Sequence, residues 1–119
     1  MLSKGTSMKL KAGEQLNFAK VTMISLEEKD ITHLTNLEKV PNILNLHLGN
    51  NKIYKMENME ALTKVKVLKL EHNNICKIEG IDSMTQLERI FLSNNYISCL
   101  ENLTHQPRLR ELFISRQKT

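Results

Sequence analysis

Histidine and cysteine are among the side chains in this sequence that could bind a metal or act as nucleophiles. His47 and His72 fall in neighbouring segments, and Cys76 lies four residues after His72. A zinc site needs three or four converging ligands, usually with Cys-x-x-Cys or His-x-x-x-His spacing, and neither spacing occurs. The sequence also lacks a Gly-rich phosphate loop and a nucleophile elbow. We therefore expect no metal site, no cofactor and no enzymatic activity.

The distribution of charge gives little support for a nucleic-acid partner. The net charge is +4, but residues 1–20 contain four lysines and one glutamate, whereas residues 21–119 contain 13 basic and 12 acidic side chains. The excess therefore lies in a basic amino-terminal arm and not on a broad basic face. We expect a solvated tail there. The alternative is an electrostatic contact with an acidic surface such as tubulin.

Composition and hydropathy predict a soluble, cytoplasmic domain. Of the 119 residues, 40% are hydrophobic and 25% are charged, which is typical of a globular chain. The hydrophobic residues occur in short groups, far from the run of roughly 18 that a membrane span needs, and the first 20 residues hold no signal-peptide block. We expect no membrane partner, and we expect reduced thiols at Cys76 and Cys99.

A repeat of 22 residues, without insertion or deletion, organises the chain after the arm. Its pattern is L-x-x-L-x-L-x-x-N-x-I-x-x-I-x-x-L, and a fixed period of this kind is typical of a solenoid in which each unit is one coil. Residues 1–20 then form the arm, with residues 8–20 covering the open edge of the first coil, and residues 21–119 form the array. The coils begin at Val21, Ile43, Val65 and Leu87, with a partial fifth coil from Leu109.

Each recurring position has a physical role. The leucines of L-x-L point inward from a short strand, so that successive coils stack into a parallel sheet. Asn51, Asn73 and Asn95 fall where the chain turns off the strand, and their amides can satisfy unpaired backbone groups of neighbouring coils. The rest of a coil is too short for a full helix. The predicted class is an α/β solenoid, with a short parallel sheet on its concave face and turns or 3₁₀ segments on its convex face.

The pattern weakens at both ends of the array. The asparagine position is Lys29 in the first coil and Gln117 in the fifth, so the asparagine column covers three coils. At the carboxyl end, no residues are recognisable as a cover for Leu109, Leu112 and Ile114, although solenoids normally need a polar cap. We expect this edge either to pair with a second copy of the chain, giving a homodimer, or to continue into a longer array.

The strand residues that flank the inward leucines face solvent, because side chains alternate along a strand. Phe91 and Phe113 occupy the same outward position on adjacent strands, about 4.8 Å apart, so their rings should touch. An exposed apolar pair among charges is typical of a partner-binding site. The alternative is that one ring covers the other near the end of the array, or that a further part of the array buries both. The candidate partner-binding residues on the predicted concave face are Phe91, Phe113, Arg89, Val67, Lys69, Glu71, His47 and Glu111.

The repeat also resembles a known family. The segments from Leu68 to Ile75 (LKLEHNNI) and from Ile90 to Leu103 (IFLSNNYISCLENL) resemble the 22-residue leucine-rich repeat subfamily named for a regulatory subunit of protein phosphatase 1, and most of all its regulatory subunit 42 type. The resemblance implies a leucine-rich repeat solenoid that binds protein partners on its concave sheet and needs no cofactor. It implies regulation of protein phosphatase 1 through the catalytic subunit. The alternative is a cytoskeletal or ciliary adaptor that binds a motor or a tubulin-associated protein.

Overall fold

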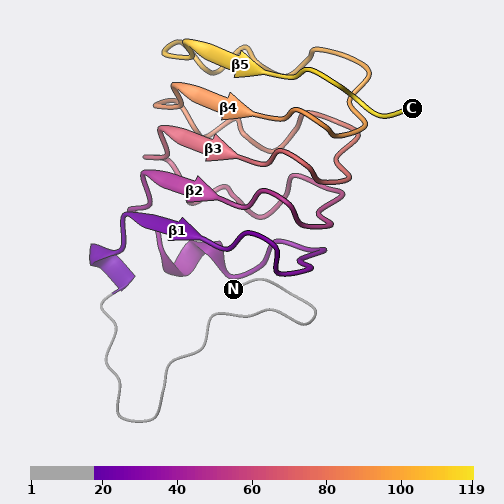
Figure 1. Ribbon diagram of the computed structural model, residues 1–119. Coiled ribbons are helices and arrows are strands. Elements are labelled where there is room, and N and C mark those ends of the chain that lie inside the picture. The colour runs from indigo at the N-terminus through magenta and orange to yellow at the C-terminus, as the bar shows by residue number, and fades with distance from the viewer. Residues whose placement is uncertain (1–17) are drawn as a thin grey trace.

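The chain folds into a stack of five coils, each of which contributes one strand to a parallel sheet (Figure 1). The computed structural model describes residues 18–119. Strand partners are 22 residues apart, as in the pairing of Ile24 with Leu46 and of Leu68 with Ile90, so the sequence repeat sets the register. The predicted solenoid with a parallel sheet is confirmed. In the order of the sheet, the strands are β1 (Met23–Ser25), β2 (Asn45–His47), β3 (Val67–Lys69), β4 (Arg89–Phe91) and β5 (Glu111–Phe113).

The side of the coils away from the strands consists of turns and bends with little helix. Two short 3₁₀ helices, η1 (Phe18–Lys20) and η2 (Leu37–Lys39), are the helical elements of residues 18–119. The α/β label therefore does not fit the described residues, because a 22-residue coil that includes a strand leaves too few residues for an α-helix. The predicted curvature, with the sheet on the concave side, stays a prediction. The strand side is called the sheet face.

Only the end of the predicted arm falls within the described residues. Phe18 in η1 is partly buried against the core, at the position that Val40, Leu62 and Met84 occupy in later coils. The rest of the predicted edge cover, residues 8–17, and the basic arm before it lie outside the described residues. No helix in the described part of the chain is both long enough and apolar enough to cross a membrane.

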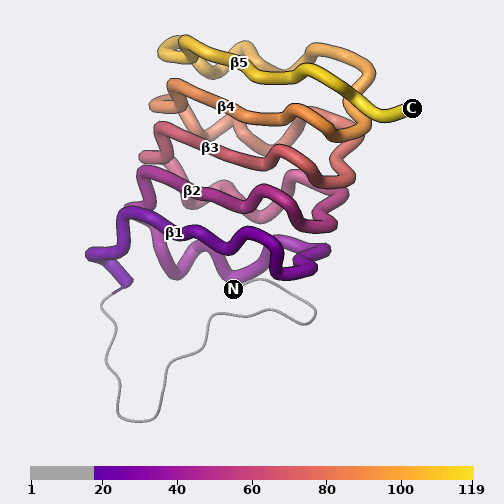
Figure 2. The backbone as a smooth tube through the Cα atoms, viewed as in Figure 1, coloured from indigo at the N-terminus to yellow at the C-terminus, as the bar shows by residue number. Residues whose placement is uncertain are grey.

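The core is a set of aliphatic side chains that continues from coil to coil, because each coil lies directly on the next (Figure 2). At the strand centres, Leu46, Leu68 and Ile90 are fully buried. Leu112 on β5 is only half-buried, because β5 is the last strand of the sheet. The stability of such a stack is approximately a sum over neighbouring coils. The last coil is therefore held by a single neighbour among the described residues.

Two columns of left-handed residues bend each coil. A left-handed backbone costs an ordinary L-residue about 1 kcal/mol, whereas glycine and asparagine adopt it more easily. Asn58 and Asn102 of the second column also donate side-chain hydrogen bonds of 2.6 Å to the carbonyls of Leu34 and Ile78, one coil earlier. Neither column was predicted from the sequence. The first consists of Glu28, Asn50, His72, Asn94 and Arg116, and the second of Asn36, Asn58, Gly80 and Asn102.

Replacing Gly80 tests the second column. Gly80 has a φ of +72°, and a Cβ atom there would lie 2.6 Å from the carbonyl oxygen of Met56. We expect Gly80→Ala to lower the free energy of unfolding by about 2 kcal/mol, measured by urea unfolding followed by circular dichroism. Gly80→Asn should cost less, because its amide would reach Met56 as that of Asn58 reaches Leu34. Equal losses in the two variants would contradict this account.

Candidate protein-binding surface

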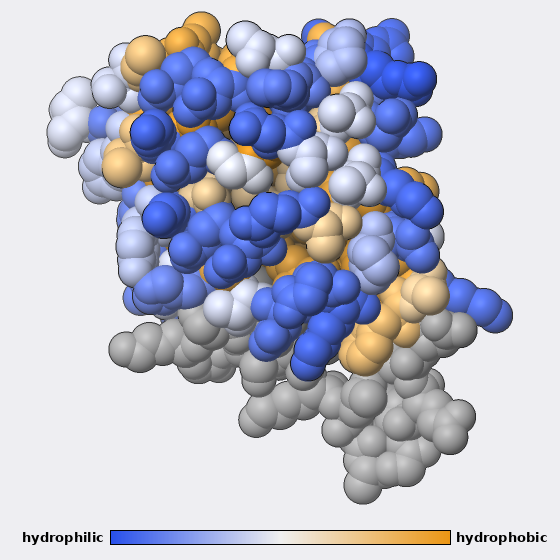
Figure 3. Space-filling model, turned by 180° about the vertical axis from the view of Figure 1, so that it is seen from behind, coloured by the Kyte–Doolittle hydropathy of each residue, from blue (hydrophilic) through white to orange (hydrophobic). Residues whose placement is uncertain are grey.

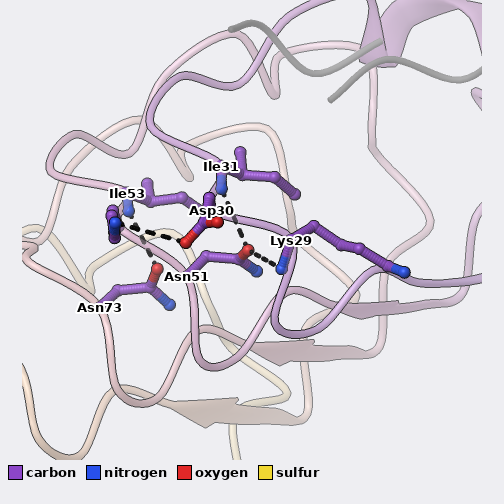
Figure 4. A network of polar contacts seen from close by, with 7 residues as sticks. Lys29, Asp30, Ile31, Asn51, Ile53 and Asn73 are labelled. Atoms are coloured by element: carbon purple, nitrogen blue, oxygen red, sulfur yellow. Dashed lines mark hydrogen bonds and ion pairs between the residues drawn. The ribbon is translucent and has the colours of Figure 1, made fainter. Parts of the chain in front are cut away.

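A column of buried carboxamides, Asn51, Asn73 and Asn95, fixes the chain where it leaves β2, β3 and β4, and Figure 4 shows the first two. The Oδ1 atom of Asn51 accepts hydrogen bonds from the backbone N–H groups of Lys29 (2.9 Å) and Ile31 (3.1 Å) in the coil before it. Its Nδ2 atom donates to the carbonyl of Leu26 in that coil and to the carbonyl of Leu48 in its own coil. Each amide thus ties two coils together. These hydrogen bonds therefore fix the backbone that carries the outward-facing side chains of the strands.

Asn73 and Asn95 make the same kinds of contact, and Gln117 extends the column to the last coil. The Oε1 atom of Gln117 accepts a hydrogen bond of 2.8 Å from the N–H group of Ile97, and its Nε2 atom donates to the carbonyl of Leu92 at 2.8 Å. The column predicted from the sequence contained only the three asparagines. The signal for a fourth member was the carboxamide at the same position of the repeat, because glutamine differs from asparagine by one methylene group.

Phe91 on β4 and Phe113 on β5 stack on the sheet face. Their ring centroids are 4.4 Å apart, and the ring planes differ by 11°. Phe113 is 38% exposed and Phe91 is half-buried. The contact follows from the register of the two strands, in which Phe91 and Phe113 are direct partners. The pair therefore presents aromatic surface to solvent from two fixed strands.

Charged groups surround the two rings. The Nζ atom of Lys69 lies 5.3 Å from the ring centroid of Phe91, within the range of a cation–π contact. Arg89 on β4 pairs with Glu111 on β5, with 2.7 Å between the Nε and Oε1 atoms, and both side chains are about half exposed. An exposed ion pair adds little to stability. Its consequence is to hold two opposite charges on the sheet face close to the rings.

The remaining candidate residues differ in their burial and in their distance from the rings. Val67 is half-buried on β3 beside Arg89, and His47 is half-buried on β2, farther from the rings. The Oε1 atom of Glu71 is buried and has no hydrogen-bond partner among the described residues. It lies 2.1 Å from the place that a Cβ atom would take on Gly49. Glu71 thus places one of its two carboxylate oxygens against the backbone of the preceding coil, where glycine leaves space, while the residue as a whole is half-buried.

The histidines and cysteines do not come together as a site in residues 18–119. No group of three His, Cys, Asp or Glu side chains in that range is placed to hold a metal ion. Cys76 and Cys99 are exposed free thiols. His72 belongs to the first left-handed column, and its Nε2 atom lies 3.3 Å from Nδ2 of Asn94. The sheet face is therefore the better candidate for function.

Four exposed basic residues, which we name the basic rim, line the edge where strands of the third and fifth coils begin. Lys66 immediately precedes β3, and Arg110 immediately precedes β5. The half-buried Glu88 lies between these two positions, in the fourth coil. The rim was not predicted from the sequence, because its members are up to 46 positions apart along the chain and only the repeat brings them to one edge. The members of the basic rim are Lys64, Lys66, Arg108 and Arg110.

Comparison with known proteins supports the repeat fold. No protein-family model matches the chain, and no curated protein matches it. Three solved structures from Listeria monocytogenes are similar. The internalin InlF has a TM-score of 0.77 and 18% sequence identity over 84% of this chain. Internalin C2 has a TM-score of 0.70 and 25% sequence identity over 84% of this chain. The functional domain of InlJ, which includes a cysteine ladder, has a TM-score of 0.69 and 15% sequence identity over 86% of this chain. The fold is that of a leucine-rich repeat solenoid. The chain spans 29%, 43% and 22% of the lengths of InlF, internalin C2 and InlJ.

The opposite side of this leucine-rich repeat solenoid is a weaker candidate for binding. Seen from behind, it shows mostly hydrophilic atoms, with hydrophobic atoms in separate areas (Figure 3). Tyr54 and Tyr96 are exposed in the turns after the strands, and both have intramolecular contacts. The ring of Tyr54 meets that of His33 edge to face at 4.9 Å, and the Nζ atom of Lys118 lies 5.0 Å from the ring of Tyr96. These tyrosines therefore pack against their own chain.

Proposed function

We propose that this chain is a non-catalytic scaffold that binds another protein through the sheet face around Phe91 and Phe113. The observation that carries the proposal is the pair of stacked, partly exposed rings on a sheet whose backbone is held by buried carboxamides. Exposed aromatic residues near charges are enriched among interface hot spots. A rigid surface also loses little conformational entropy on binding. The leucine-rich repeat fold supports the same role, because stacked repeats form extended binding surfaces.

Replacing both rings by alanine tests this proposal. We expect Phe91→Ala combined with Phe113→Ala to weaken partner binding about 1,000-fold, because hot-spot aromatics each contribute about 2 kcal/mol or more and about 1.4 kcal/mol is a factor of ten in the dissociation constant. The partner is first identified by affinity purification and mass spectrometry with the unchanged chain. Its dissociation constant is then measured by isothermal titration calorimetry for each variant.

The exposed tyrosines provide a matched control. Tyr54→Ala combined with Tyr96→Ala also removes two exposed rings, but from turns outside the sheet face. This variant should bind the partner as the unchanged chain does, and circular dichroism should show both double variants folded. If the double phenylalanine variant binds with an unchanged dissociation constant, the sheet face is not the binding surface.

We further propose the catalytic subunit of protein phosphatase 1 as the partner, in the cytoplasm. The support for this partner is the sequence resemblance in the segments 68–75 and 90–103. Gel filtration with the purified catalytic subunit should yield a complex, and phosphatase activity in that complex should differ from that of the free subunit. Cosedimentation with microtubules or with a motor protein, without phosphatase binding, would favour the cytoskeletal or ciliary adaptor instead.

A homodimer through β5 is a separate proposal. The half-buried Leu109, Leu112 and Ile114 support it, together with the position of β5 as the last strand, since an open sheet edge can pair with a second strand. Light scattering at rising protein concentration should then report the mass of two chains. A monomer at every concentration would reject the dimer and leave the sheet-face proposal unaffected.

A further inference from the structure

We infer that the partner contributes an acidic peptide segment with one apolar side chain, which packs against Phe91 and Phe113 while its carboxylates bind the basic rim. This inference rests on the proposed function and names the chemistry of the partner. It combines two features that lie on the same part of the solenoid, in coils three to five. One is the stacked ring pair, and the other is the set of four exposed cations at the start of the strands.

The basic rim has a strong local excess of positive charge. The repeat positions that form the rim in coils three to five hold four cations and one acidic side chain, the half-buried Glu88, whereas residues 21–119 as a whole contain 13 basic and 12 acidic side chains. The ion pairs between described residues include none of the four rim side chains. Lys64 donates a hydrogen bond of 2.8 Å to the neutral amide oxygen of Asn42 and so keeps its charge uncompensated. An incoming carboxylate would therefore meet cations that have no anionic partner.

The spacing of the two features fits a short extended peptide. Arg110 lies three residues before Phe113, which is roughly 10 Å along a strand. Lys66 and Arg110 are two coils apart, which is again roughly 10 Å across the sheet. An extended peptide covers such a distance with about three residues. One apolar residue and two acidic residues within about five positions would therefore reach both the rings and the rim.

Other charges on the sheet face favour this position for the peptide. Glu27, exposed after β1, and the carboxylate of Glu71, after β3, disfavour an acidic segment at the other edge of the first three strands. Arg89 lies between the rings and the rim, and its guanidinium has donors beyond the one that Glu111 uses. A carboxylate that approaches over β4 would therefore meet the remaining donors of Arg89 before it reaches the rings, whereas Glu111, at the same level on β5, would repel it.

The arrangement of the rings favours a peptide over a single-stranded nucleic acid. Nucleic-acid bases stack on open aromatic faces. Phe91 and Phe113 cover one face of each other, and Lys69 lies over the ring of Phe91. This leaves few open faces for bases, whereas ring edges remain accessible to an aliphatic or aromatic side chain.

A selection from random peptides tests the inference even before the partner is identified. Displayed peptides of about twelve residues, long enough to cross the sheet in extended form, are selected on the immobilised full chain. We expect enriched sequences to carry an apolar residue with at least two Asp or Glu residues within about five positions. A synthetic copy of the most enriched peptide is then titrated with the chain by fluorescence anisotropy, at low and at high salt.

Two charge-reversal variants give the decisive comparison. Arg108→Glu combined with Arg110→Glu should weaken peptide binding by about tenfold or more, because two contacts are lost and two repulsions are added. Lys55→Glu combined with Lys77→Glu makes the same change in net charge at exposed positions outside the sheet face, and should leave binding within about twofold. Salt should weaken binding to the unchanged chain, because dissolved ions screen the attraction between solvent-exposed charges.

Three outcomes would overturn the inference. They are enriched peptides without an excess of acidic residues, equal binding by the two charge-reversal variants, and tighter binding of a single-stranded oligonucleotide than of the selected peptides. If peptide binding is lost in the Phe91 and Phe113 double variant but kept in the Arg108 and Arg110 double variant, the proposed function stands and only the acidic partner fails. If binding survives removal of both rings, the proposed function itself fails.

Discussion

Asn73→Ala should lower the free energy of unfolding by about 4 kcal/mol, which is one of the two largest effects that we expect from a single substitution in this chain. Asn73 is 1% exposed. Its Oδ1 atom accepts from the N–H group of Ile53 at 3.0 Å, and its Nδ2 atom donates to the carbonyls of Leu48 and Leu70 at 3.1 and 3.0 Å. Alanine would leave these buried groups without partners. Each unsatisfied buried group costs about 1–3 kcal/mol.

The loss should spread through the array because Asn73 joins two coils. Ile53 and Leu48 belong to the second coil, and Asn73 belongs to the third. In a stack whose stability comes from neighbouring coils, a weakened junction in the middle divides the array into two smaller parts. A small domain has about 5–15 kcal/mol of stability in total, so a loss of about 4 kcal/mol is a large share of it and should shift the midpoint of urea unfolding to a clearly lower concentration.

The adjacent Asn74 provides the control for this prediction. Asn74 is exposed, and its backbone N–H bonds the carbonyl of Ile53, a contact that does not depend on its side chain. Asn74→Ala should change the free energy of unfolding by less than about 0.5 kcal/mol. Urea unfolding followed by circular dichroism measures both variants. Similar small effects in both would mean that water replaces the amide of Asn73, and that the buried carboxamides do not hold the sheet face in place.

The sequence alone was sufficient to predict the strands, their register and the strand residues that point into the core. A repeat of 22 residues places Ile24, Leu46, Leu68 and Ile90 at one position, and stacking then determines which residues become neighbours. The contact between Phe91 and Phe113 follows from the same register. These features depend only on which residues share a position in the repeat.

Other features depend on backbone shape or on a missing side chain, and the repeat pattern did not reveal them. Glu28, His72 and Arg116 share a left-handed backbone although their side chains have nothing in common, so residue type gave no signal. The Oε1 atom of Glu71 can lie against the preceding coil because Gly49 there has no side chain. The basic rim appears only after residues of the third and fifth coils are brought to one edge.

Leu68→Ala and Leu112→Ala should differ strongly in cost, although both remove the same atoms from the same position of the repeat. Leu68 is fully buried between the second and fourth coils, whereas Leu112 is half-buried on the last strand. We expect Leu68→Ala to lower the free energy of unfolding by about 3 kcal/mol, through lost burial and the cavity left behind. Leu112→Ala should lower the free energy of unfolding by about 1 kcal/mol, because the side chain of Leu112 buries less apolar surface on folding and the open edge can relax.

Urea unfolding of both variants at two protein concentrations decides what lies against β5. A cost that is small for Leu112→Ala and independent of concentration means that the strand faces solvent, as its half-buried side chains indicate. If Leu112→Ala instead costs as much as Leu68→Ala, the edge must be covered in solution. Covering by a second copy would make the midpoint of unfolding rise with protein concentration, because association stabilises the folded chain by mass action. This comparison therefore separates the homodimer from an open edge without depending on the partner that binds the sheet face.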